Sequence, residues 1–151
     1  MERKKEIIVL CGASHSGKSD YAQEYHVTHT IISSDKIRAE LGVRYGEAED
    51  KVWRIFAARK FEAMQRLDNI ILDACHLSVK ARRNALRDVN GGYRKIAVVF
   101  NPPWWKLVGR CVREKRMDLR TVRAIWEKWN SNKPTKKELL LAGFDEVQEV
   151  E

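Results

Sequence analysis

The stretch from Gly12 to Ser19, which reads GASHSGKS, constrains the possible folds of this chain more than any other part of the sequence. It matches the pattern G-x-x-x-x-G-K-[ST]. The apolar run 7–11 precedes it, and a helical pattern up to about residue 26 follows it. A strand, a glycine-rich loop and a helix in this order form a phosphate-binding loop, because the backbone N–H groups and the helix N-terminus attract phosphate.

We therefore predict that this loop binds ATP through the residues Gly12, Ala13, Ser14, His15, Ser16, Gly17, Lys18 and Ser19. Lys18 is expected to reach the β- and γ-phosphates, and the Ser19 hydroxyl is expected to bind Mg²⁺. For His15 we expect the backbone N–H to contact phosphate and the side chain to point to solvent.

Apolar runs typical of strands alternate with helical patterns along the rest of the chain. The expected strands cover about 7–10, 30–34, 69–73, 94–100 and 146–150, and the expected helices cover about 17–26, 47–67, 78–89, 104–116, 119–129 and a short segment from 135. This alternation predicts an α/β fold: a P-loop NTPase-type parallel sheet of about four or five strands flanked by helices. We expect a single domain over residues 1–151.

The positive charge of the chain is concentrated in one segment. Lys and Arg number 29 against 21 Asp and Glu, which gives a net charge of +8. Residues 79–123 alone carry 13 basic and 3 acidic side chains, a net +10. A local basic field of this kind suits a polyanionic ligand such as ATP or nucleic acid, and its alternative is a solvated basic face.

The cysteines and the N-terminus indicate the compartment. Cys11, Cys75 and Cys111 are far apart and odd in number, which argues against a disulfide framework and against zinc. We expect them to be buried thiols. The first apolar run is too short for a signal peptide or a membrane span, so we expect a cytoplasmic protein without membrane contact.

Acidic residues stand where two expected strands end. Asp35 follows the second strand, and a carboxylate there can take the proton of an attacking hydroxyl. Arg38, three residues on, shares its helical face and can hold phosphate; the equal alternative is that Asp35 caps the helix and pairs with Arg38. Asp73 ends the third strand and resembles the acid that orders Mg²⁺ in P-loop enzymes, or it orients Arg38 or the acceptor.

Three motifs together carry a resemblance to a known family. They are GASHSGKS at 12–19, ISSDKIR at 32–38 and LDACHLSVKARR at 72–83. With VFNPPW at 99–104 and GFDEV at 143–147, they resemble the phage-type polynucleotide 5′-kinase family and its zeta-toxin-like P-loop relatives. The resemblance covers nearly the whole chain.

The resemblance implies roles for particular side chains. In that family the aspartate after the second strand is the general base and the arginine three residues on is essential, which here implies Asp35 and Arg38. A helical lid, here about 104–123, supplies arginines to the ATP phosphates. Arg113 is the best match to the catalytic arginine and Arg110 the second, with Cys111 in place of the family's usual asparagine.

Other aromatic and basic residues are expected to be structural or peripheral. Trp53 is expected in the core, as are Trp126 and Trp129. Three arginines are expected either to follow an acceptor backbone or to face water, namely Arg82, Arg83 and Arg87.

The sequence thus predicts a kinase that uses ATP and Mg²⁺ to phosphorylate a hydroxyl of nucleic acid, DNA or RNA, most simply the 5′-hydroxyl end. A second interpretation keeps the chemistry and changes the acceptor to the hydroxymethyl group of a modified pyrimidine in phage DNA. A third is a small-molecule or nucleoside kinase, which would not need the basic segment 79–123. A non-enzymatic nucleotide switch would leave Asp35 and Arg38 unexplained.

Overall fold

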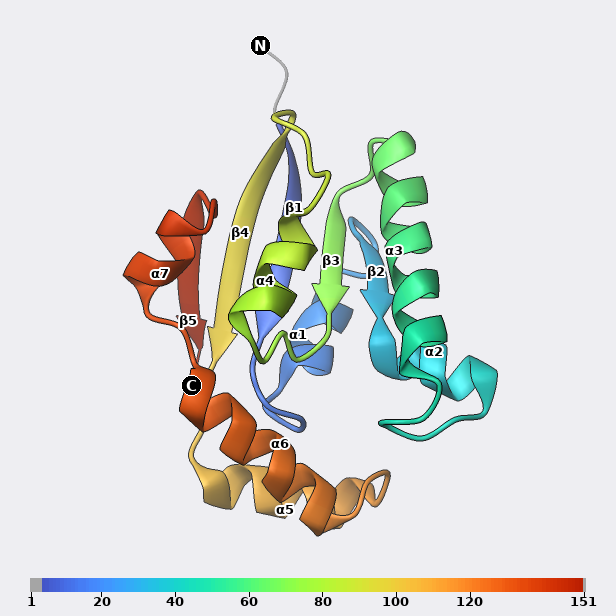
Figure 1. Cartoon of the computed structure of the whole chain (residues 1–151), viewed down its shortest axis with the longest axis vertical. Helices are drawn as coiled ribbons and strands as arrows, with labels where there is room; N and C mark the ends of the chain where they lie inside the picture. The colour runs from blue at the N-terminus through green and yellow to red at the C-terminus, as the bar shows by residue number, and fades with distance from the viewer. Residues whose placement is uncertain (1–3, 151) are drawn as a thin grey trace.

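Five parallel strands form the sheet on which the rest of the molecule is built. The computed structural model describes residues 4–150. The strands are β1 Lys5–Cys11, β2 Thr30–Ser33, β3 Ile70–Asp73, β4 Tyr93–Phe100 and β5 Glu146–Val150, and they lie in the order β2-β3-β1-β4-β5 (Figure 1). The α/β fold with a parallel sheet is therefore confirmed.

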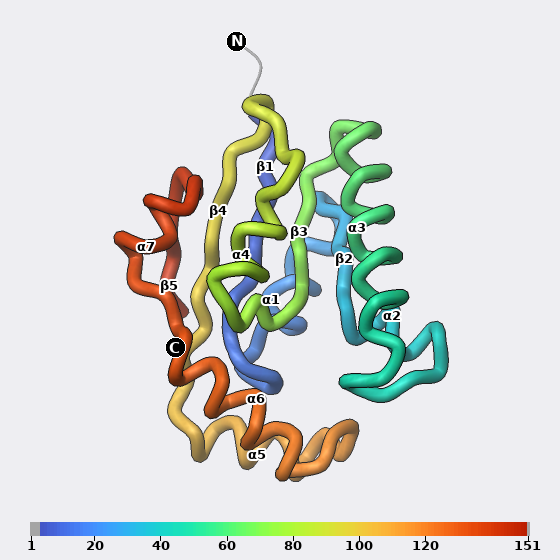
Figure 2. The backbone as a smooth tube through the Cα atoms, in the orientation of Figure 1, coloured from blue at the N-terminus to red at the C-terminus, as the bar shows by residue number. Residues whose placement is uncertain are grey.

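Helices cover both faces of this sheet and its carboxyl edge. They are α1 Lys18–Glu24, α2 Ser34–Leu41, α3 Glu49–Gln65, α4 Val79–Leu86, α5 Trp104–Glu114, α6 Leu119–Asn132 and α7 Lys136–Leu141. Helix α1 lies behind the sheet, whereas α3, α4 and α7 lie in front of it (Figure 2). Helices α5 and α6 lie beyond the carboxyl ends of the strands, where ligands bind in this class of fold.

The alternation of side chains along β1 divides the core into two clusters. Ile7 and Val9 are fully buried and face the side of α3 and α4. Ile8 and Leu10 face the opposite side, where Ala22 of α1 packs against them. Burial on both faces explains why the central strands are apolar throughout.

Pairing registers bring the loops that follow the strands to one edge. Ser33 at the end of β2 pairs with Asp73 at the end of β3, and β3 in turn pairs with β1. The Ser33 hydroxyl accepts a hydrogen bond from the backbone N–H of Lys36 at 3.2 Å and so caps α2. As a result, the first turn of α2 begins directly beside the loop that follows β1.

The cysteines and the helices of this fold bear on the thiols and on membrane contact. Cys11 and Cys111 are buried and Cys75 is partly buried, and all three are free thiols. Within residues 4–150, no three His, Cys, Asp or Glu side chains gather into a group that could hold a metal ion. None of the helices in this part of the chain combines the length and apolar character that crossing a membrane requires.

Candidate active site

The loop between β1 and α1 needs its two glycines for different reasons. A Cβ atom on Gly12 would lie 2.8 Å from the backbone oxygen of Phe100 and 2.9 Å from Ser16 Oγ, so packing excludes any larger residue. Gly17 has a φ of +102°, a conformation that side-chain-bearing residues rarely adopt. The loop thus has the close approach and tight turn that phosphate binding requires.

The interior of this loop has the donors that a triphosphate needs. Among the described residues, no acceptor contacts the backbone N–H groups of His15, Gly17, Lys18 and Ser19. The Lys18 ammonium lies inside the loop, 2.6 Å from the oxygen of Ala13 and 3.0 Å from that of Gly12. Unpaired N–H groups around a buried ammonium fit the phosphates of ATP.

A hydroxyl and a carboxylate meet at the start of α1. Ser19 Oγ donates to Asp73 Oδ2 at 3.1 Å, and Asp73 is buried at the end of β3. Burial raises the pKa of Asp73, while the nearby Lys18 ammonium and the Ser19 hydroxyl oppose that rise. Hard oxygen donors of this kind suit Mg²⁺, which keeps several waters and takes few protein ligands.

Asp35 and Arg38 form a pair on the first turns of α2. Arg38 Nη1 donates to Asp35 Oδ1 at 2.8 Å, and Arg38 is buried whereas the Asp35 side chain is half exposed. Burial by itself would lower the pKa of Arg38, but Glu49 and Asp35 outweigh it and raise that pKa. The Asp35 carboxylate is therefore half exposed, with Oδ1 held in place by Arg38.

Glu49 is a site residue that sequence reasoning missed. It stands in the first turn of α3, and its two carboxylate oxygens accept from Arg38 Nη2 at 2.8 Å and Arg38 Nε at 3.1 Å. The Tyr45 ring lies 4.9 Å from the Arg38 guanidinium carbon. Glu49 and Tyr45 thus fix the orientation of Arg38. Both residues lie beyond the end of α2, so their spacing from Arg38 in the sequence does not predict this contact, and only the folded structure shows it.

The arginines of the segment after β4 differ in where they point. Arg110 Nη1 donates to the backbone oxygen of His15 at 2.8 Å, and Arg116 Nη1 lies 3.3 Å from Asp35 Oδ2. Arg113 is exposed, donates to the oxygen of Gly109 at 3.4 Å, and does not line the cavity described below. Arg110 of α5 and Arg116, which follows the end of α5, thus contact the two halves of the site, and Arg113 of α5 does not.

The expectation that the His15 side chain faces solvent is wrong. His15 is buried, with Nδ1 2.7 Å from Ser14 Oγ and Nε2 3.3 Å from Glu114 Oε2. Burial lowers the pKa of His15, and the Arg116 charge lowers it further, which favours the neutral ring. The backbone of His15 has a φ of +65°, and its ring lies beside Glu114 at the end of α5.

Arg82 corrects a second expectation. It neither faces water nor points to an open groove, because it is buried and donates to the backbone oxygens of His76 and Asn132, both at 2.9 Å. Arg83 and Arg87, in contrast, are exposed. Arg82 therefore ties the loop after β3 to the end of α6.

Trp53 corrects a third expectation, because it is not a core residue. Its side chain is 41% exposed on α3, whereas Trp129 is fully buried and Trp126 partly buried. The Trp53 ring packs against Phe56, with ring centroids 5.0 Å apart and planes at 62°.

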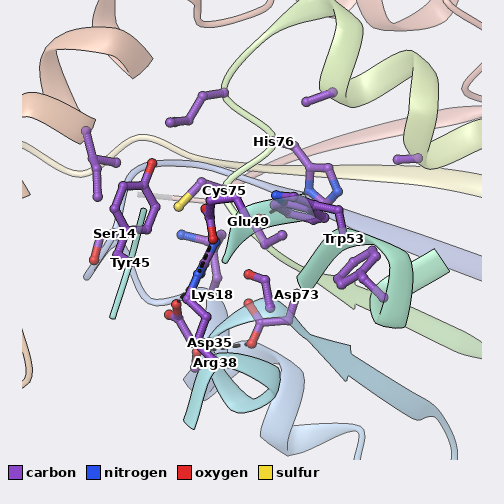
Figure 3. A pocket seen from close by; sticks show the side chains of 18 of the residues that line it. Ser14, Lys18, Asp35, Arg38, Tyr45, Glu49, Trp53, Asp73, Cys75 and His76 are labelled. Carbon is purple, nitrogen blue, oxygen red and sulfur yellow. Dashed lines mark hydrogen bonds and ion pairs between the residues drawn. The ribbon is translucent and has the colours of Figure 1, made fainter. Parts of the chain in front are cut away.

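The key groups of the site open into one cavity of about 690 Å³ (Figure 3), which is lined by Lys18, Ser19, Asp35, Arg38, Glu49 and Asp73 among others. The phosphate loop, the first turn of α2 and the inner faces of α3 and α4 form its walls. Figure 3 shows Lys18, Asp35 and Arg38 clustered at one place in it. The cavity is large enough for a nucleotide and part of a second ligand.

The sequence of the chain matches a known domain family. The family model described as an AAA domain, AAA_33, matches residues 7–134. A comparison with curated proteins gives no match.

Solved structures share the fold at low sequence identity. A chain of the Pnkp1/Rnl/Hen1 RNA repair complex superimposes with a TM-score of 0.74 at 17% identity, covering 88% of this chain and 46% of that one. For the PezAT toxin–antitoxin system of Streptococcus pneumoniae the TM-score is 0.67 at 20% identity, covering 99% of this chain and 68% of that one. A gluconokinase from Sinorhizobium meliloti 1021 superimposes with a TM-score of 0.61 at 17% sequence identity. The match covers 99% of this chain and 83% of that one.

The present chain is shorter than several of the structures it resembles. It spans 46% and 40% of the two matched chains from the Pnkp1/Rnl/Hen1 complexes. The matched family and the kinase fold together support an ATP-dependent kinase, and this fold implies ATP as the phosphoryl donor. The chain belongs to the AAA_33 family and has the fold of a P-loop kinase.

Proposed function

We propose that this chain transfers the γ-phosphoryl group of ATP to a 5′-hydroxyl end of DNA or RNA. The observation that carries this proposal is the position of the Asp35 carboxylate, which shares one cavity with Lys18 and is held by Arg38 at 2.8 Å. A carboxylate so placed can accept the proton of a hydroxyl that attacks phosphorus.

The donor half of the site is built by the phosphate loop. ATP supplies the transferable phosphoryl group when bound, and Mg²⁺ neutralises its charge. The loop N–H groups and the Lys18 ammonium would bind phosphate oxygens, with Lys18 exchanging its present contacts to Gly12 and Ala13 for them. Ser19 and Asp73 are the residues that would hold Mg²⁺.

The acceptor half depends on Asp35 and its two arginines. Asp35 Oδ1 is bound by Arg38, and Asp35 Oδ2 lies 3.3 Å from Arg116 Nη1. An acceptor hydroxyl would replace Arg116 at Oδ2 and lose its proton there, while Arg38 keeps the carboxylate oriented. Freed from Asp35, Arg116 becomes a cation available to the transferring group.

We also propose that the segment 104–123, which contains α5 and the start of α6, acts as a lid over the donor site. Arg110 already contacts the phosphate loop through the oxygen of His15. The resemblance to polynucleotide kinases favours Arg113 as the catalytic arginine, but the cavity favours Arg110 and Arg116, which both line it. Arg113 would need a rotation of α5 to reach the phosphates.

The basic segment supports a nucleic-acid acceptor. Of its side chains, those of Lys80, Arg87, Arg110 and Arg116 line the cavity. A small neutral acceptor would not need cations beyond those that bind ATP. Phosphodiester groups on an acceptor strand would bind to them, so acceptor binding should weaken steeply with salt.

One assay tests the proposal. The protein is incubated with γ-labelled ATP and, separately, with a 5′-hydroxyl oligonucleotide, DNA containing hydroxymethyl-pyrimidines, a mixture of nucleosides and sugars, or no acceptor. Label at the 5′ end supports the proposal. Label only on internal pyrimidines would move the acceptor to a modified base, and label only on small molecules would overturn a nucleic-acid acceptor altogether.

A further inference from the structure

Part of the cavity has no role in the phosphoryl transfer described above. Beyond Arg38 its walls are the inner faces of α3 and α4 and the loop between β3 and α4. The aromatic rings on α3 that line it belong to Trp53, Phe56 and Phe61, and the loop contributes His76. This part of the cavity has the flat apolar surface that a planar ligand group requires.

Trp53 presents an indole ring that the fold does not bury. One of its neighbours on α3, Val52, is fully buried, whereas Trp53 is 41% exposed and lines the cavity. The Trp53 ring is held by Phe56 on one side and has the Arg38 guanidinium carbon 6.0 Å from its centroid. A ring fixed in this way loses little entropy when a second ring stacks on it.

His76 presents a hydrogen-bond acceptor in the same region. Its ring packs against Phe56 from another side, with centroids 6.5 Å apart. His76 Nδ1 lies 2.6 Å from the oxygen of Leu10 and 3.1 Å from that of Ala74. Because carbonyl oxygens only accept, Nδ1 must carry the proton.

The second nitrogen of His76 is therefore free to accept a hydrogen bond. Burial lowers the pKa of His76 to about 4, so the ring is neutral at neutral pH and Nε2 has a lone pair. Within residues 4–150, Nε2 of His76 has no hydrogen-bond partner. It is also not fully buried, since His15 Nε2 is the only fully buried side-chain N or O atom without a hydrogen-bond partner in this part of the chain. It is thus open to the cavity that His76 lines.

Charged groups at the rim complete the region. Lys80 from α4, Arg87 just after α4 and Lys128 from α6 line the cavity, together with the acidic residue Asp88. Lys60 is not available for a ligand, because its ammonium donates to the backbone oxygens of Asn84, Ala85 and Arg87 at 3.0–3.3 Å. The rim therefore carries a net positive charge next to an aromatic wall, which is the combination that binds single-stranded nucleic acid.

We propose that this region holds the base of the 5′-terminal acceptor nucleotide, with the base stacked on Trp53 and an N–H group of its edge donating to His76 Nε2. This inference rests on the proposed function and adds to it, since it states which part of the acceptor the cavity recognises. Trp53 and His76 are binding residues in this proposal, and the phosphoryl transfer itself remains with Asp35 and Arg38.

The test compares acceptors and variants in the same kinase assay. For the wild type, replacing the terminal base of a 5′-hydroxyl oligonucleotide by an abasic residue should raise the acceptor KM about five- to a hundredfold, as expected for the loss of one stacked base. Trp53→Leu should cause a similar rise with the normal acceptor and no further rise with the abasic one, while the KM for ATP stays constant. Trp53→Phe should recover part of the loss.

The control is Leu141→Ala. Leu141 is an apolar residue that is 80% exposed at the end of α7 and does not line the cavity, so its truncation should leave the use of both acceptors unaffected. A measurement without turnover adds a second readout: binding of the oligonucleotide should quench tryptophan fluorescence in the wild type and in Leu141→Ala, but much less in Trp53→Leu.

The contact to His76 is tested without changing the protein. An oligonucleotide that ends in unsubstituted purine has no N–H group on its base edge, and its KM should exceed that of an adenine end about fivefold or more, because His76 Nε2 would lose its partner. Equal use of the two ends would overturn the role of His76. Transfer that is unaffected by Trp53→Leu and by the abasic end would overturn the stacking proposal alone, whereas no transfer to any 5′-hydroxyl end would overturn the proposed function with it.

Discussion

The two halves of the active site are built in different ways. The donor half comes mainly from eight consecutive residues, Gly12–Ser19, which Asp73 and Arg110 join from elsewhere. The acceptor half gathers Asp35, Arg38, Glu49 and Arg116, which are spread over more than half of the chain. A local motif is set by backbone conformation, whereas a dispersed site is set by the packing of several helices. Substitutions in the two halves should therefore fail in different ways.

The largest effect should come from Asp35→Asn. It removes the proposed base and one charge partner of Arg38, so kcat should fall about 10⁴-fold, at the upper end of general-base effects. Binding of ATP should be retained, because the donor half does not depend on Asp35. Steady-state kinetics with a 5′-hydroxyl oligonucleotide and a separate ATP-binding measurement would show this, with Asp118→Asn, the exposed cap of α6, as a control. An active Asp35→Asn would remove Asp35 as the base.

The next effect concerns which arginine links the two halves. Arg110→Ala should lower kcat about 10³-fold, the lower end of arginine-finger effects, because Arg116 also lines the cavity. Arg113→Ala should lower it less, since Arg113 faces away from the cavity. Comparing the kcat values of the two variants decides whether Arg110 or Arg113 stabilises the transferring phosphoryl group. A larger loss in Arg113→Ala would mean that α5 rotates during the reaction and that the family resemblance identified the right residue.

His76 should make stability depend on pH. Its pKa is about 4 in the folded chain against an ordinary value of 6.5, so between these values the unfolded chain binds a proton that the folded chain does not. The free energy of unfolding should thus fall by about 3 kcal/mol as pH drops from 6.5 to 4. Urea denaturation of the wild type and of His76→Asn measures the difference. Asparagine tolerates the φ of +49° at this position, and identical pH slopes would contradict the prediction.

The smallest effect should come from the loop backbone. In Gly12→Ala the new methyl group would meet the oxygen of Phe100, which cannot move without disturbing β4, so stability should fall by about 1–3 kcal/mol. Thermal unfolding measures this loss, and ATP affinity should fall with it. Gly109→Ala is the control, because nothing lies within 4 Å of the added atom and alanine favours the helix. A stable Gly12→Ala would show that the loop adapts and is less rigid than the acceptor half.

Much of the fold and of the donor half could be predicted from the sequence. Runs such as Ile7–Leu10 are apolar because both faces of the strand are buried, so the residue types alone indicate a buried strand. The loop 12–19 could be predicted in the same way, because its backbone conformation requires glycine at fixed positions and its chemistry requires lysine and serine after the second glycine. The pairing of Asp35 with Arg38 also follows from helical spacing, and the structure places these two residues 2.8 Å apart.

Other residues could not be placed from spacing. The periodicity of Arg110, Arg113 and Arg116 suggests one helical face, but the rotation of α5 brings Arg110 and not Arg113 to the cavity, and Arg116 lines the cavity from the turn after α5. In the same way, spacing along the chain does not give the rotation of α3, which leaves Trp53 partly exposed, or that of α4, which buries Arg82. His15 could not be placed because Glu114, its neighbour, is about a hundred residues away.

The sequence by itself thus determined the order of strands and helices, the phosphate loop and the acid–arginine pair, because each depends on residues close together in the chain. The tertiary structure alone decided which residues meet in the proposed acceptor half: Glu49 against Arg38, Arg116 against Asp35, and Trp53 and His76 both against Phe56. These contacts join segments whose relative rotation is set by side-chain packing across the whole core. Local pattern therefore specifies the phosphoryl donor site, and packing specifies the acceptor site.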